Sequence, residues 1–161
     1  MKKLLIIIVL LSSVFLVACE KGDSSNITSN KMLHEHCTRS GVLDGGTADL
    51  QYDIYYTGDI LNKIESYEAV SSEDSSLLDQ YEEAYNTIHA YYKGLNYYIT
   101  KVERTEGSIE STIIIDYDKI NIDELISIEG EEDNIFENKV PKVSKWKELA
   151  KKVGTKCELV S

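Results

Sequence analysis

The clearest pattern in the sequence is an alternation of apolar and polar side chains over residues 48–57. The apolar positions are every second residue, at Ala48, Leu50, Tyr52, Ile54 and Tyr56. Because successive side chains of a strand point to opposite faces, this alternation predicts a β-strand with one buried face. Thr57-Gly58-Asp59 predicts a turn, and residues 60–70 predict a returning strand. The two segments together form a predicted β-hairpin.

A helical period follows this hairpin. Apolar residues recur at steps of three and four, at Leu77, Tyr81, Ala84, Ile88, Tyr91 and Leu95. These steps place them on one stripe of an amphipathic helix that packs on a sheet. Ser71 and Ser72 are candidate N-cap residues, and Gly94 marks the expected end of the helix. His89 is expected at the surface or boundary of this helix.

A second hairpin is predicted by residues 96–105 and 108–118, which are separated by a Glu106-Gly107 turn. On its second strand, alternate positions share a face, at Ile109, Ser111, Ile113, Ile115 and Tyr117. Asn121 can then cap a short helix over residues 122–128.

The last helix is predicted to begin at a Ser144 cap and to end at Gly154. Its apolar side holds Trp146, Leu149, Ala150 and Val153. A brief strand at residues 156–160 completes the chain. The order of elements predicts an α+β fold class, a two-layer sandwich in which a mainly antiparallel sheet of two β-hairpins is covered on one face by helices.

The first nineteen residues combine a basic start with an apolar core. Lys2 and Lys3 precede an apolar run of about 13 residues, which as a helix would span roughly 20 Å. This is less than the ~30 Å of a bilayer core, so a signal peptide is favoured over a transmembrane helix. The ending Leu16-Val17-Ala18-Cys19 resembles the lipobox of bacterial lipoproteins. The resemblance implies cleavage before Cys19 and acylation of its thiol; the alternative is an ordinary secretory signal with an incidental cysteine.

These features divide the chain into three parts. Residues 1–18 are the predicted lipoprotein signal peptide, residues 19–31 a lipidated N-terminus and flexible tether, and residues 32–161 a single α+β extracytoplasmic domain. Two acyl chains anchor a protein durably, whereas one chain holds it marginally. The expected location is therefore extracytoplasmic, with the domain lipid-anchored to the cell membrane through Cys19.

Composition adds one exclusion to this picture. The 161 residues fit one domain, and their formal net charge is −11. A nucleic-acid partner is excluded, since binding would require a basic surface that neutralises phosphates. Removal of residues 1–18 also removes Lys2 and Lys3, so the mature chain would be more acidic still. We expect it to stand off an anionic membrane surface.

Two cysteines remain when Cys19 is assigned to lipid. Cys37 lies near the start of the predicted domain and Cys157 near its end. An even remainder in an exported chain favours a disulfide between them. Two separate thiols are the alternative, because pairing also requires Cα atoms within about 7 Å.

Three features together resemble the YehR-like bacterial lipoproteins. They are the lipobox, the hairpin segment at residues 55–61 and the segment Ile115-Asp116-Tyr117-Asp118-Lys119-Ile120-Asn121-Ile122-Asp123-Glu124-Leu125. The likeness spans about residues 37 to 160 beyond the signal. It implies a small two-layer α+β domain outside the cytoplasmic membrane with no established activity. The acylated cysteine is the one functional residue that it carries over, and it does not bear on the disulfide.

His34-Glu35-His36-Cys37 contains metal-ligand side chains, and in an extended segment His34 and His36 would point to the same side. A metal site also requires further converging ligands, and a helical zinc-protease motif requires histidines four residues apart. We therefore interpret the segment as a polar junction between tether and domain, and we expect no metal or cofactor.

Tyrosines and an acidic loop form the predicted ligand surface. A tyrosine ring with its polar tip can line a carbohydrate or peptide groove, and packing in the core is the alternative. The acidic residues near 129–133 do not match the spacing of an EF-hand, which favours a solvated loop over a calcium site. The candidate ligand-surface residues are Tyr85, Tyr92, Glu131, Glu132 and Asp133.

No enzyme motif accompanies these residues: the chain has no nucleophile elbow, phosphate-binding glycine loop or dinucleotide fingerprint. We expect a binding or interaction module of the bacterial envelope, with membrane lipid as one partner and an envelope protein or small molecule as another. The alternatives are a small envelope hydrolase or metal-binding protein that uses carboxylates or histidines, and a structural spacer.

Overall fold

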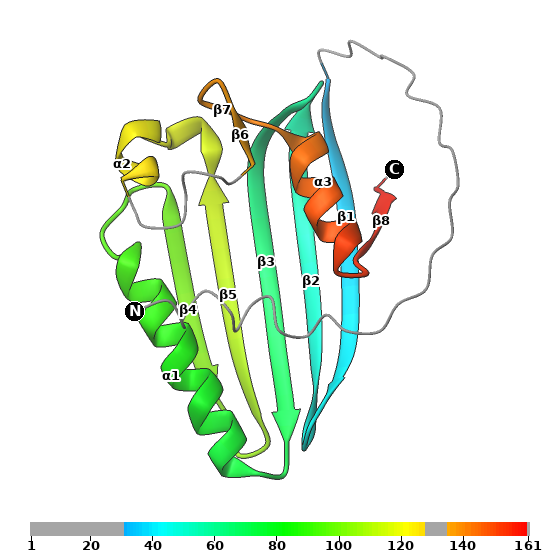
Figure 1. Ribbon diagram of the computed structural model, residues 1–161, viewed down its shortest axis with the longest axis vertical. Coiled ribbons are helices and arrows are strands. Elements are labelled where there is room, and N and C mark those ends of the chain that lie inside the picture. The colour runs from blue at the N-terminus through cyan, green and yellow to red at the C-terminus, as the bar shows by residue number, and fades with distance from the viewer. Residues whose placement is uncertain (1–30, 128–134, 161) are drawn as a thin grey trace.

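A six-stranded antiparallel sheet dominates the computed structural model, which describes residues 31–127 and 135–160 (Figure 1). The strand order is β4-β5-β3-β2-β1-β8. The strands are β1 (Met32–Leu43), β2 (Gly46–Thr57), β3 (Ile60–Ser72), β4 (Tyr98–Arg104), β5 (Ser108–Asp116) and β8 (Lys156–Leu159). The other elements are α1 (Ser75–Tyr91), a 3-10 turn η1 (Tyr117–Lys119), α2 (Ile122–Ile126), α3 (Val143–Lys152) and a small hairpin of β6 (Phe136–Glu137) and β7 (Val140–Pro141).

The predicted α+β class and antiparallel sheet are confirmed, but the sheet is larger than two hairpins. The segment interpreted as a polar junction is β1, which pairs with β2 from Met32 to Leu43. The pattern missed this strand because two of its inward positions, Glu35 and Arg39, are charged. Glu35 accepts a hydrogen bond from Lys147 of α3, and Arg39 donates one to the Val153 carbonyl. Charged residues at inward positions break the apolar alternation that would indicate a buried strand face, even when a partner compensates their burial.

Figure 1 shows α1 and α3 packed on the same face of the sheet. Beneath them lie two apolar clusters that share a partly buried Tyr52. One cluster, under α3, contains Cys37, Ile54, Leu61 and Val143. The other, under α1, contains Leu50, Val70, Leu78 and Ile109. The sheet face that carries α1 and α3 is called the inner face below, and the opposite one the outer face.

The predicted α1 exists, but its buried side differs from the predicted stripe. The buried residues are Leu78, Tyr85 and His89, whereas Tyr91 is 60% exposed. The inner face of the sheet beneath α1 presents polar groups, Glu68 and Ser111, and the helix turns its own polar aromatic residues toward them. A stripe drawn through apolar positions of one segment cannot anticipate this match, because the polar partners lie on other strands.

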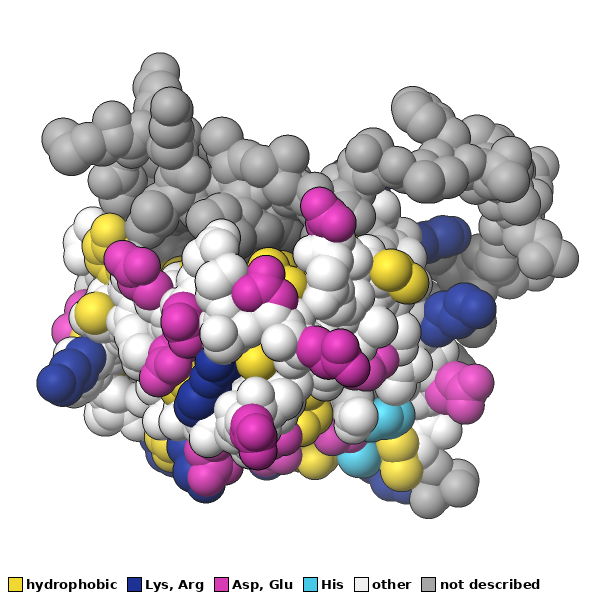
Figure 2. Space-filling view, turned by 90° about the horizontal axis from the view of Figure 1, so that it is seen from below, with side chains coloured by type: hydrophobic (Ala, Val, Ile, Leu, Met, Phe, Trp, Pro, Cys, Tyr) yellow, Lys and Arg dark blue, Asp and Glu magenta, His cyan; other side chains and the backbone are white. Residues whose placement is uncertain are grey.

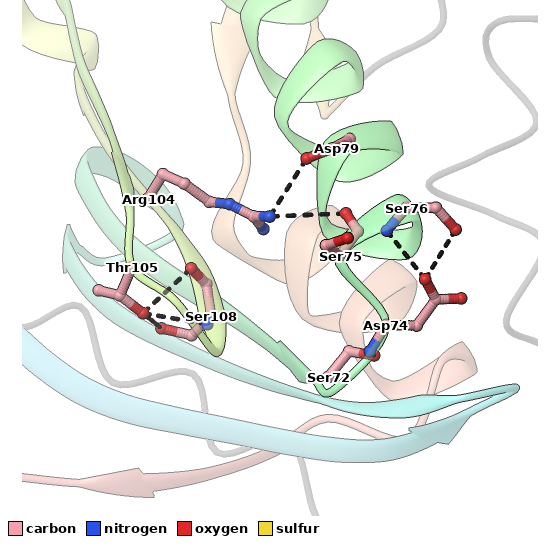
Figure 3. Close-up of polar contacts among 8 residues, drawn as sticks. All are labelled: Ser72, Asp74, Ser75, Ser76, Asp79, Arg104, Thr105 and Ser108. Atoms are coloured by element: carbon pink, nitrogen blue, oxygen red, sulfur yellow. Dashed lines mark hydrogen bonds and ion pairs between the residues drawn. The ribbon is translucent and has the colours of Figure 1, made fainter.

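The caps also differ from those predicted. Asp74, not Ser71 or Ser72, caps α1 and accepts a hydrogen bond from the Ser76 backbone N–H (Figure 3). Arg104 of β4 reaches the same end of α1 and pairs with Asp79 at 3.1 Å. The first turn of the helix is thereby fastened to the β4–β5 hairpin.

The start of α3 is capped by a residue far away in the sequence. Ser144 does not act as the predicted N-cap; its backbone N–H donates to Asp59 Oδ1 at 3.0 Å, in the β2–β3 turn. Leu149, predicted on the apolar side, is 48% exposed. The helix ends before Gly154, which has φ of 83° as a helix-stopping glycine requires. The Asn121 cap of α2 and the last strand, β8, are as predicted.

Candidate functional site

A pocket of about 350 Å³ lies where α1 ends and β4 begins. Its lining residues come from the last turns of α1, the following turn and β4, and are Asn86, His89, Ala90, Tyr92, Lys93, Gly94, Tyr98 and Thr100. The volume is within the range of small-molecule sites. The position follows from topology, because the short connection after α1 brings the chain back onto the sheet edge.

His89 forms the buried side of this pocket. Only 8% of the residue is exposed, and burial lowers the pKa of its imidazole below the usual value. The ring is therefore neutral at pH 7. Its Nε2 shares a hydrogen bond of 3.3 Å with Ser111 Oγ of β5. The sequence pattern placed His89 at the surface or boundary of the helix, because the partner that keeps it inside comes from a strand 22 residues away.

Tyr92 and Tyr98 form an aromatic wall of the pocket. Their rings stack with centroids 4.4 Å apart and an interplanar angle of 19°. Tyr98 also meets the edge of the His89 ring, at 6.3 Å. Tyr92, one of the predicted ligand-surface residues, lines this pocket. No sequence signal identified Tyr98 as its partner beyond membership of a tyrosine-rich segment.

The other predicted ligand-surface residues are not at this pocket. Tyr85 lies in the core with 7% exposure, stacked toward His89 and beside the Glu68 carboxyl. Burial, followed by the charge of Glu68, raises the pKa of Tyr85; burial also raises the pKa of Glu68. The structure therefore supports the core alternative for Tyr85. Glu131, Glu132 and Asp133 lie outside the described residues, as do Cys19, the signal peptide and most of the tether.

A second polar cluster lies on the outer face. Asp53 Oδ1 accepts hydrogen bonds from His34 Nε2 at 2.7 Å and from His36 Nδ1 at 3.1 Å. Partial burial works against the Asp53 charge, but the two histidine hydrogen bonds outweigh it and hold the pKa of this carboxyl below its usual value. The prediction that His34 and His36 point to the same side is confirmed. Figure 2 shows histidine side chains exposed at the surface.

Cys37 and Cys157, the predicted pair, are joined by a disulfide that links β1 to β8. Glu35 lies beside it, and its Oε1 accepts hydrogen bonds from the Tyr56 hydroxyl and from Lys147 Nζ at 2.6 Å. Among the described residues, Glu35 and these two sulfurs are the one trio of potential metal-ligand atoms that all lie within 4.8 Å of one another. Because the sulfurs are bonded to each other, the trio is a structural link and not a metal centre.

Two solved structures share this fold. The NMR structure of the E. coli YehR protein has a TM-score of 0.55 and 18% identity, over 80% of this chain and 93% of that chain. The NMR structure of a protein from Streptococcus pneumoniae TIGR4 has a TM-score of 0.50 and 14% identity, over 91% and 97%. Likeness at this level of identity shows the fold alone. The YehR-like fold implied by the sequence resemblance is thus supported.

No family model matches the chain, and neither does any curated protein. No helix in the part of the chain that the structure describes has the length and apolar character needed to span a membrane.

Proposed function

We propose that this protein is a lipid-anchored, extracytoplasmic binding module that takes a small saccharide into the pocket between α1 and β4. The anchor is supported by the basic start, apolar core and lipobox-like ending at Cys19. The ligand site is supported by the pocket itself, and the stacked pair Tyr92 and Tyr98 beside the neutral His89 is the observation that carries the proposal.

The chemistry of the lining favours an uncharged polyhydroxyl ligand. Tyrosine offers an apolar ring and a polar tip, which together suit the mixed faces of a sugar. Asn86 and Thr100 add an amide and a hydroxyl that can each donate and accept hydrogen bonds. Lys93 at the pocket is the single formal charge among its lining residues.

Binding rather than catalysis is proposed because the nearest serine is inaccessible. Ser111 shares a hydrogen bond with His89, an arrangement that could activate a nucleophile. However, Ser111 is only 3% exposed and does not line the pocket. The pair supports the pocket from behind, and the Ser111 hydroxyl is not placed to attack a bound ligand.

The ligand is tested by titrating the full chain, in detergent, with glucose, galactose, N-acetylglucosamine and its disaccharide while recording NMR shifts or calorimetric heats. We expect at least one of these probes to bind and Thr100→Val to weaken its binding about 2- to 12-fold, as loss of one hydrogen bond predicts. Thr112→Val, on the adjacent strand but the outer face, is the matched control and should bind as wild type does. Failure of all four probes to bind would refute a saccharide ligand.

The anchor is tested separately by Cys19→Ala. In cells fed labelled palmitate, we expect wild-type protein to be labelled and to fractionate with membranes. The variant should carry no label and should accumulate as unprocessed precursor, because acylation and cleavage both require the thiol at this position. A wild-type chain that is unlabelled, or that is found in the cytosol, would show that the lipobox interpretation is incorrect.

A further inference from the structure

The histidine cluster on the outer face is built by strand register. His34 and His36 are two apart on β1, so their side chains leave the same face of the sheet. Asp53 of β2 pairs directly with His36 and is diagonal to His34. Three side chains from two strands thereby meet at one oxygen atom, Asp53 Oδ1.

The chemistry of this set is that of a transition-metal site. Two neutral imidazoles and one carboxylate form the ligand group found in open sites for zinc and for non-haem iron. Imidazole favours zinc, copper, nickel and iron over the hard ions calcium and magnesium, which prefer oxygen ligands. The cluster thus discriminates between metals in a way that an acidic surface patch does not.

We propose that His34, His36 and Asp53 bind one divalent transition-metal ion, such as Zn²⁺, on the outer face of the sheet. The imidazoles flank the carboxylate oxygen, so binding requires them to turn from Asp53 onto the ion. The ligand atoms of the three residues do not all lie within 4.8 Å of one another, so the ion has to draw them together. The side chains are partly exposed, at 29%, 42% and 35%, and the turn of His34 would give up its stacking on the Tyr55 ring. The ion takes the place of the protons that now bridge the nitrogens to Asp53.

Neighbouring charges are compatible with a cation at this position. Glu158 of β8 pairs with His36 on its other side and can add a fourth ligand or hold a metal-bound water. Two lysines on the outer face oppose a cation: Lys63, which lies over the Tyr55 ring that stacks on His34, and Lys156 of β8, which is diagonal to His36. The Lys63 ammonium is paired with Glu65 at 2.7 Å, which offsets its repulsion of an ion.

The disulfide connects this site to the rest of the fold. Cys37 follows His36 directly and is bonded to Cys157, which precedes Glu158. The covalent link therefore keeps β8 in register and holds Glu158 opposite His36. The histidine cluster lies on the outer face of the sheet, whereas the saccharide pocket lies on the inner face beside α1. The two sites are therefore independent.

The test is equilibrium dialysis of the full chain, in detergent, against ZnCl₂, with NiCl₂ and CaCl₂ as comparison ions. We expect about one zinc per chain and no stoichiometric calcium. His36→Ala and Asp53→Asn should each weaken zinc binding at least tenfold. Asp49→Asn is the matched control, because Asp49 lies on the same face of β2 but accepts its hydrogen bond from Ser40 and not from a histidine.

Two further measurements distinguish binding at this cluster from misfolding of the variants and from zinc bound elsewhere on the chain. Zinc should raise the melting temperature of wild type but not of Asp53→Asn, and the variants without metal should melt close to wild type, which shows that they fold. Imidazole NMR signals of His34 and His36 should shift on addition of zinc while those of His89 do not. The proposal is overturned if wild type binds no zinc, if Asp49→Asn weakens binding as much as Asp53→Asn, or if His34 and His36 do not respond.

Discussion

Loss of the Cys37–Cys157 disulfide is expected to destabilise the domain by about 2–5 kcal/mol, which is a large share of the ~5–15 kcal/mol that stabilises a typical domain. The two cysteines are 120 residues apart, so the bond closes almost the entire folded chain into one loop. In the chain-entropy account, a cross-link over so long a loop restricts the unfolded ensemble strongly. Its loss should also release β8, which pairs with β1 over only four residues.

The measurement is urea unfolding of the oxidised chain, the reduced chain and the Cys37→Ala/Cys157→Ala variant, all with Cys19→Ser so that no third thiol interferes. The reduced chain loses the cross-link but keeps both sulfur atoms. The double variant also loses packing, since Cys37 is fully buried in the cluster under α3. Reductant should not change the stability of the double variant. Equal midpoints for the oxidised and reduced chains would contradict the expected role of the bond.

The strands whose inward residues are apolar could be predicted from the sequence. In β2, inward Ala48, Leu50 and Ile54 are buried, and the alternation alone identified the strand and its faces. In β1, inward Glu35 and Arg39 have partners on or just beyond α3. Burial of a charge depends on a partner distant in sequence, so a periodicity measured on one segment cannot detect it.

The candidate sites show the same division. Tyr92 could be proposed as a ligand-surface residue because aromatic residues cluster along that part of the chain. His89 could not be assigned, since its position depends on Ser111 of β5. From the sequence, Asp53 was indistinguishable from any polar residue on the outward side of a strand. Only the register of β1 against β2 brings it to His34 and His36. Pairing between strands is the information that a single sequence lacks.

The second large expected effect is a loss of stability that depends on which side of α1 faces the sheet. Leu78 is fully buried in the cluster under this helix, so Leu78→Ala should destabilise the domain by about 2–5 kcal/mol through lost apolar contact and a cavity. Tyr91 belongs to the stripe predicted from the sequence but is 60% exposed, so Tyr91→Ala should change stability by no more than ~0.5 kcal/mol. Urea unfolding of the two variants measures the difference directly.

This pair of variants separates two orientations of one helix. If α1 buried the predicted apolar stripe, Tyr91→Ala would be the costly change and Leu78→Ala the mild one. With Leu78 inward, Tyr85 and His89 follow on the same side, about two and three turns further along the helix toward the pocket. Leu78→Ala should therefore also loosen the His89 contact with Ser111, and a saccharide that binds wild type should bind this variant less tightly even under conditions where it remains folded.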